Sequence, residues 1–186
     1  VSVEGTGITL ALTGAGTISG GNSGAATALS VTGTGNTITN AWTVGGSSHA
    51  GGAVVINSGG TTTGFTNSGT IQSSSGTAFN VTSGDTLTAL TNTGTITSAT
   101  GSAVVVANTG TITTLTNTDG HITNTGGTGN AINLAGSGAI TTLDNTNGTI
   151  SSTSASAISL AGTSTIGTFT NDGGTVTSTG TGSANA

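Results

Sequence analysis

The chain contains no Lys, Arg, Cys, Pro, Met or Tyr among its 186 residues. Its only acidic residues are Glu4, Asp85, Asp119, Asp144 and Asp172, which give a formal net charge of -5. Without a basic side chain the protein cannot neutralise phosphate groups, so we expect no nucleic-acid binding and no electrostatic docking on an anionic membrane. The lack of Cys excludes a disulfide framework and a thiolate metal site.

Long hydrophobic runs are missing as well. No apolar stretch approaches the roughly 20 residues that a bilayer-spanning helix needs, so we expect no membrane insertion by this segment. The opening residues 1–4, V-S-V-E, show no basic region of a signal peptide. Leu, Ile, Val and Phe make up about 19% of the chain, a share that is typical of disorder. The low net charge and the regular spacing of these residues indicate a folded chain instead.

What the chain does contain is a repeat of about 26 residues that reads L-T-N-x-G-T-I. Aligned on the first apolar residue, the repeats start near positions 12, 38, 65, 90, 115, 143 and 169, at Leu12, Ile38, Phe65, Leu90, Leu115, Leu143 and Phe169. A period of this size is typical of stacked units that bury their apolar faces against their neighbours. We therefore predict a single repeat array over residues 1–186.

Apolar residues also recur in register inside each repeat. Pairs spaced two residues apart indicate short strands with one buried face, and they occur at Leu29/Val31, Val54/Ile56, Phe79/Val81, Val104/Val106, Ile132/Leu134 and Ile158/Leu160. No helical period is long enough for a helix. Three short strands per repeat predict an all-β fold, a parallel β-helix of roughly seven coils and about 34 Å in length, with right-handed crossovers.

Two polar columns accompany the apolar ones. An Asn follows the first apolar residue by two positions in six repeats, at Asn40, Asn67, Asn92, Asn117, Asn145 and Asn171. Stacked amides at strand spacing form hydrogen-bonded ladders, so we predict an asparagine ladder. A Gly lies two positions before the last apolar residue of the motif, an Ile or Val that we call the second apolar residue. It does so in six repeats, at Gly16, Gly69, Gly94, Gly120, Gly148 and Gly174. We expect turns with positive φ at these glycines.

The recurring segments L-T-N-T-G-T-I-T-S and G-x-A-I-x-L carry a family resemblance. Residues 90–98 with 102–106, and 143–152 with 156–160, are similar to passenger-domain repeats of type V autotransporters of Gram-negative bacteria. The resemblance implies a right-handed β-helix that is secreted or displayed at the cell surface, attached to the outer membrane through a segment not present here, and often adhesive. The total lack of Lys and Arg departs from that pattern. We also expect either a fragment of a longer array or a filament subunit.

The titratable residues give no sign of a reaction. The carboxylates occupy different positions in their repeats and form no acid/base pair. His49 falls in a loop of variable length, and His121 precedes a buried position, so its side chain should face solvent. We predict no enzyme activity, no catalytic residue, no metal site and no cofactor.

Uncharged side chains remain as candidates for contact with a partner. Trp42 takes the place of the repeat Gly, and it either anchors a sugar or partner chain or packs against a neighbouring loop. Thr95 with Thr97 and Thr175 with Thr177 form intact Thr-x-Thr pairs on an exposed strand. Thr is also a common residue on exposed strands, which explains the pairs without a ligand.

These observations favour a non-enzymatic rod in a bacterial extracellular or surface protein. We expect it to act in adhesion, aggregation or fibre formation by associating with further copies of itself, end to end or laterally. One alternative is an ice-binding protein with a Thr-rich flat face. Another is a carbohydrate-binding β-helix, for which host or surface glycans would be the partners.

Overall fold

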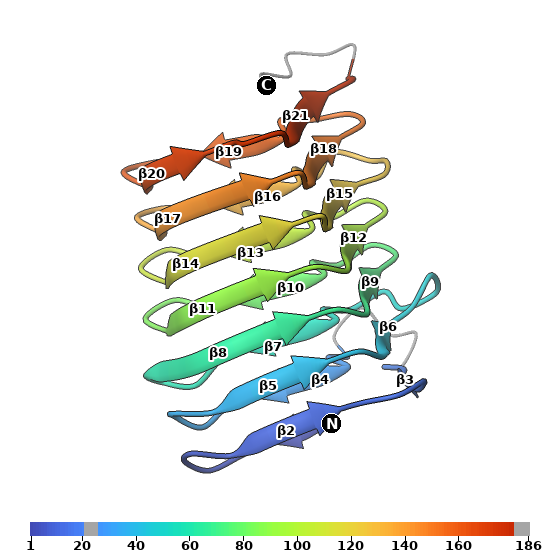
Figure 1. The fold of residues 1–186 in the computed structure, drawn as a ribbon, viewed down its shortest axis with the longest axis vertical. Coiled ribbons are helices and arrows are strands. Elements are labelled where there is room, and N and C mark those ends of the chain that lie inside the picture. Colours follow the sequence, from blue (N-terminus) through green and yellow to red (C-terminus); the bar gives the residue numbers. More distant parts are fainter. Residues whose placement is uncertain (21–25, 181–186) are drawn as a thin grey trace.

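The computed structural model describes residues 1–20 and 26–180, and within these ranges every regular element is a β-strand. Figure 1 shows a stack of coils along one long axis, with the N-terminus at one end of the stack. The strands form three parallel sheets of seven strands each. The predicted parallel β-helix of about seven coils is therefore confirmed. In the described ranges no helix is long and apolar enough to cross a membrane.

Each coil contributes one strand to each sheet. The first sheet contains β1 (Ser2–Val3), β4 (Leu29–Val31), β7 (Val54–Ile56), β10 (Phe79–Val81), β13 (Val104–Val106), β16 (Ile132–Leu134) and β19 (Ile158–Leu160). The second sheet contains β2 (Thr9–Leu12), β5 (Thr37–Asn40), β8 (Thr61–Asn67), β11 (Thr86–Asn92), β14 (Thr111–Thr118), β17 (Ala139–Thr146) and β20 (Thr165–Thr170). The third sheet contains β3 (Thr17–Ile18), β6 (Thr43–Gly45), β9 (Thr70–Ser73), β12 (Thr95–Ser98), β15 (His121–Asn124), β18 (Thr149–Ser152) and β21 (Thr175–Ser178).

The core is a set of columns of like residues that run along the axis. Ile96, for example, pairs with Ile71 in the preceding coil and with Ile122 in the following coil. All three side chains are fully buried. Strand pairing in register places equivalent residues about 4.8 Å apart, so each apolar side chain is covered by its own counterpart in the next coil. Stacking therefore buries an apolar core that one coil of about 26 residues cannot enclose alone.

The first repeat starts two residues earlier than the sequence predicts. Leu10, and not Leu12, pairs with Ile38, while Leu12 pairs with Asn40. Residues two apart on a strand face the same side, so the alternation of apolar residues cannot distinguish the two registers. The pairing of β2 with β5 decides it. Leu12 consequently occupies the position before Asn40 in the asparagine column.

One core column contains a polar residue. Thr62 pairs with Leu87 and is fully buried, in the column that continues through Ile112 and Ile140. Its Oγ1 has no hydrogen-bond partner in the part of the chain that the structure describes. A buried hydroxyl without a partner costs free energy relative to an apolar group of the same shape.

We expect Thr62→Val to raise the free energy of unfolding by about 1 kcal/mol, because it removes the buried hydroxyl and keeps the branched shape. The matched control is Thr61→Val, at the exposed neighbouring position, which should change stability by less than about 0.5 kcal/mol. Chemical denaturation followed by circular dichroism measures both. If Thr62→Val instead lowered the free energy of unfolding, the hydroxyl would have a hydrogen-bond partner on which the fold depends.

Candidate functional site

The asparagine column forms a continuous hydrogen-bonded ladder inside the stack. The Nδ2 group of each Asn donates to the Oδ1 atom of the next, over 2.8 Å from Asn40 to Asn67 and 2.7 Å from Asn145 to Asn171. The intervening bonds, Asn67 to Asn92, Asn92 to Asn117 and Asn117 to Asn145, have the same direction. The Asn side chains from Asn40 to Asn145 are fully buried. The ladder predicted from the sequence is therefore present.

Each ladder amide also holds the chain at the bend between the second and third sheets. Asn92 Nδ2 donates to Gly94 O in its own coil at 3.2 Å and to His121 O in the next coil at 3.3 Å. Asn145 makes the equivalent bonds to Gly148 O and Thr175 O. One amide thus joins its own bend to the coil that follows, which gives the ladder a direction along the axis.

The repeat glycines serve a different purpose from the one predicted. None of Gly16, Gly69, Gly94, Gly120, Gly148 and Gly174 has positive φ. A Cβ atom at Gly94 would instead lie less than 3.0 Å from the backbone carbonyls of Ser68 and Gly69 in the preceding coil. At Gly120, Gly148 and Gly174 it would collide with the ladder amides. These glycines are required by the close approach of adjacent coils, and not by the φ of a turn.

The structure contains a second inward polar column, which was not predicted from the sequence. It contains Ser73, Ser98, Asn124, Ser152 and Ser178 at the ends of the third-sheet strands. Each of these side chains donates to a backbone carbonyl of the preceding coil, in the loop after the third-sheet strand. Ser98 Oγ, for example, donates to Gly76 O at 2.7 Å. In the sequence, the signal for this column was a Ser or Asn two positions after the second apolar residue of these repeats. These bonds fasten the variable loops to the stack.

Trp42 packs against the first coil of the rod. Its indole ring lies where a Cβ on Gly16 would be, and its Nε1 donates to Thr13 O at 2.9 Å. The side chain is half-buried and packs against the core. The structure thus uses one face of the only Trp for a contact between the first two coils.

The Thr pairs singled out from the sequence do not form one surface. Thr95 and Thr97 lie on β12, whereas Thr175 and Thr177 lie on β21, and β15 and β18 separate the two strands. His121 and Gln72 interrupt the outward columns between and beside them. His121 is exposed, as its position in the repeat predicts.

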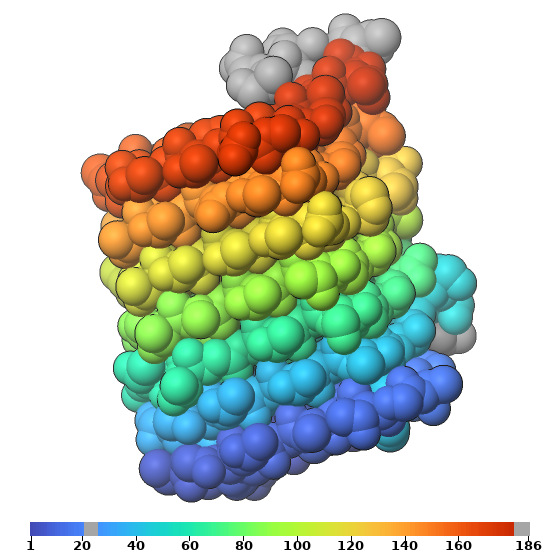
Figure 2. Space-filling model, in the orientation of Figure 1, coloured from blue at the N-terminus to red at the C-terminus, as the bar shows by residue number. Residues whose placement is uncertain are grey.

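The second sheet carries a more regular array, which we call the threonine face. Three columns of outward residues pair in register along the axis: Thr9, Thr37, Gly64, Ala89, Thr114, Thr142 and Thr168; Ala11, Thr39, Thr66, Thr91, Thr116, Asp144 and Thr170; and Thr61, Thr86, Thr111, Ala139 and Thr165. The signal for it was a Thr on one or both sides of the first apolar residue of each repeat. Figure 2, which views the stack from this side, shows the coils in contact layer upon layer.

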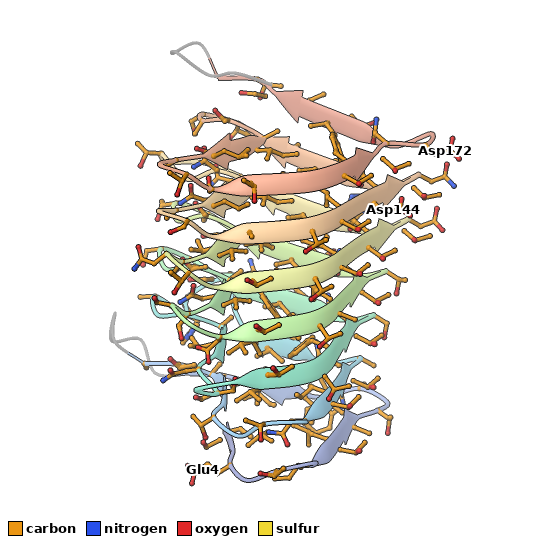
Figure 3. The ribbon with its side chains drawn as sticks, turned by 90° about the vertical axis from the view of Figure 1, so that its left-hand side faces the viewer. Glu4, Asp144 and Asp172 are labelled. Carbon is orange, nitrogen blue, oxygen red and sulfur yellow. The ribbon has the colours of Figure 1, made fainter. Side chains whose placement is uncertain are left out.

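The hydroxyls of the threonine face are available to a partner. On the third sheet Thr123 Oγ1 donates to Thr97 Oγ1 at 3.1 Å, whereas the Thr hydroxyls of the three columns make no such bond to the described residues. Asp144 accepts a bond from Thr146 Oγ1 at 2.8 Å. It is the single charge in the three columns, and Figure 3 shows it near the edge of the rod. Branching at Cβ restricts χ1, so these hydroxyl and methyl groups have few orientations to lose on contact.

The titratable side chains do not converge. Asp85 is buried and its carboxylate accepts bonds from Gly59 N at 2.7 Å and Ser58 Oγ at 3.1 Å, so it closes a turn between two coils. His49 is buried in its loop beside Gly52 O. Within residues 1–20 and 26–180 no pocket is present, and no three His, Asp or Glu residues lie close enough together to hold a metal ion.

No family model matches the chain, and neither a curated protein nor a solved structure shows significant similarity to it. The resemblance to autotransporter passenger repeats therefore stays a prediction.

We expect Asn92→Ala to lower the free energy of unfolding by about 3 kcal/mol, because it leaves Asn117 Oδ1 without a donor and removes the Asn92 bonds to Gly94 O and His121 O inside the stack. Asn171→Ala is the matched control. Asn171 is exposed at the end of the ladder, so its loss should cost less than about 1 kcal/mol. Equal losses for the two variants in urea denaturation would show that the ladder adds nothing to stability.

Gly94→Ala should destabilise the protein by about 2 kcal/mol or more, since backbone of the preceding coil occupies the space of the new methyl group. Gly64→Ala provides the control, because the nearest atom to its added Cβ, Ala89 O, is 3.9 Å away. That variant should lie within about 0.5 kcal/mol of wild type. Thermal melting of the two proteins measures the difference, and a tolerated Gly94→Ala would contradict the close-approach explanation.

Proposed function

We propose that this chain is a non-enzymatic structural and adhesive segment of a bacterial extracellular or cell-surface protein. It acts as a rigid rod in adhesion, aggregation or fibre formation by associating with further copies of itself. The observation that carries the proposal is the threonine face, a regular and almost uncharged array on a stiff sheet. The resemblance of the repeats to autotransporter passengers supports the surface location.

Two physical properties support self-association. Like rods approach each other with little electrostatic repulsion, because the whole chain carries only five acidic side chains and no basic one. The threonine face offers donors, acceptors and methyl groups at a fixed repeat, so two copies can match each other along the axis. The ladder and the three sheets keep this array from bending, which lowers the ordering cost of a contact.

A second candidate function, ice binding, is favoured by the same face. Its Thr side chains repeat about 4.8 Å apart along the axis and about 6.7 Å apart along a strand where alternate residues are Thr. A crystalline surface presents a repeating array that such a face can match, whereas a small soluble ligand does not. The carbohydrate alternative depends on Trp42, whose ring is half-buried over Gly16.

A pair of Lys substitutions distinguishes these functions. Thr66→Lys with Thr91→Lys places two charges on the threonine face, in the third and fourth coils. Thr70→Lys with Thr95→Lys is the matched control, in the same coils on the third sheet. We expect wild type and control to form lateral bundles in negative-stain electron microscopy, and the face variant to lose them through charge repulsion.

The other outcomes decide between the candidates. Thermal hysteresis in wild type that the face variant loses would replace self-association by ice binding. Glycan binding that Trp42→Ala abolishes would favour the carbohydrate function. Absence of bundles in wild type at every concentration, or equal loss in face variant and control, would contradict lateral association through the threonine face.

A further inference from the structure

The threonine face contains a recess that is two coils tall. In one of its columns the third and fourth coils have Gly64 and Ala89, which pair with each other. Thr37 and Thr114 occupy the coils on either side of them in the same column. The space above Gly64 is open, because a Cβ atom built there would have only Ala89 O within 4 Å, at 3.9 Å. A side chain of a partner can therefore enter the face at this point.

The neighbouring column carries larger side chains in the same two coils. Thr66 lies two residues after Gly64 on β8 and is exposed. Thr91 lies two residues after Ala89 on β11 and pairs with Thr66. Two residues of a strand span about 6.7 Å and their side chains face the same side of the sheet. The face thus places two projecting branched side chains directly beside a recess of the same height.

We propose that two copies of this chain pair through their threonine faces about a two-fold axis that runs parallel to the rods, vertical in Figure 2, and passes between these two columns. The axis keeps each coil opposite the same coil and places each column opposite the other. Thr66 of one copy then lies over Gly64 of the second copy, and Thr91 lies over Ala89. The contact is isologous and closes at two rods. This inference rests on the proposed self-association and specifies its geometry.

A two-fold axis perpendicular to the rods fits the face less well. It makes the two rods antiparallel and places each column opposite itself. Centred between the third and fourth coils, it sets Gly64 against Ala89 of the second copy and leaves a void between them. It also sets Thr66 against Thr91, where two branched side chains compete for the same space. Voids lose dispersion contacts and overlaps force side chains out of their rotamers, so the parallel pair is the better packed arrangement.

The single charge on the face also obtains a hydrogen-bond donor in the parallel pair. Asp144 and Thr142 occupy the two columns in the sixth coil, so the axis places Asp144 opposite Thr142 of the second copy. Thr146 Oγ1 donates to Asp144 Oδ1 at 2.8 Å, and the other carboxylate oxygen can accept from the Thr142 hydroxyl. Because the chain contains no Lys or Arg, a hydroxyl is the kind of donor that a second copy can offer.

The direction of pairing decides which rods the contact joins. Rods that project from one surface point the same way, so a parallel pair connects neighbours on that surface. An antiparallel pair would instead connect rods from two opposing surfaces. The threonine face, in the arrangement proposed, therefore builds fibres and bundles from neighbouring rods, with the parallel pair as their unit.

Single Cys variants measure the arrangement, because the chain contains no Cys of its own. Thr91→Cys mixed with Ala89→Cys places two thiols opposite each other in the parallel pair. Thr91→Cys mixed with Thr66→Cys is the matched control, since these positions are opposite each other only in the antiparallel pair. We expect the mixed disulfide to form at least about tenfold faster in the first mixture, measured on a non-reducing gel with a tag on one variant. Faster cross-linking in the control mixture would overturn the inference.

Filling the recess tests the fit between the two copies. Ala89→Leu should weaken pairing by at least about tenfold in sedimentation equilibrium, because the larger side chain takes the space of Thr91 of the second copy. Ala139→Leu makes the same change in the outward column farthest from the axis, and it should leave pairing within about twofold of wild type. Equal effects of the two variants would contradict the proposed fit. Circular dichroism checks that both variants keep the strand content of wild type.

The results separate this inference from the proposed function. Bundles that disappear with the Thr66→Lys and Thr91→Lys substitutions, combined with faster cross-linking in the control mixture, would overturn the parallel pair and leave self-association through the threonine face intact. Absence of bundles in wild type, combined with no cross-link in either mixture, would contradict both.

Discussion

Hydrogen bonding between adjacent coils sets the geometry of the whole rod. Each strand bonds to the equivalent strand one coil away, and the resulting spacing of about 4.8 Å applies to every side chain in the rod. Small residues are needed wherever the backbone itself crosses that gap, as Gly94 does above Ser68 and Gly69. Apolar residues fill the interior because each one is covered by its counterpart. A chain with few large apolar residues can thus build a dry core by repetition.

The same spacing allows polar groups inside the core. Amides at the coil repeat satisfy one another, so the ladder from Asn40 to Asn171 buries polar atoms with little desolvation cost. Thr62 shows the contrasting case. It pairs with Leu87, and its hydroxyl has no hydrogen-bond partner among the described residues. Polar residues are therefore tolerated in this interior where a whole column shares them.

Repetition extends to the surface of the rod. A side chain that recurs in sequence becomes a row in space, and the Thr residues of the second sheet become an array with few orientations to lose. The proposed lateral contact through the threonine face therefore follows from the same geometry that builds the core.

The period, the strand class, the inward apolar columns and the asparagine ladder could all be predicted from the sequence, because each of these is a regular spacing along the chain. The sequence did not determine the register of the first coil, since Leu10 and Leu12 lie on the same side of a strand and only the pairing with Ile38 distinguishes them. It also missed why the repeat glycines are required and where the largest Thr array lies. Those properties depend on which atoms of different coils meet, and the distances between coils exist only once the chain is stacked.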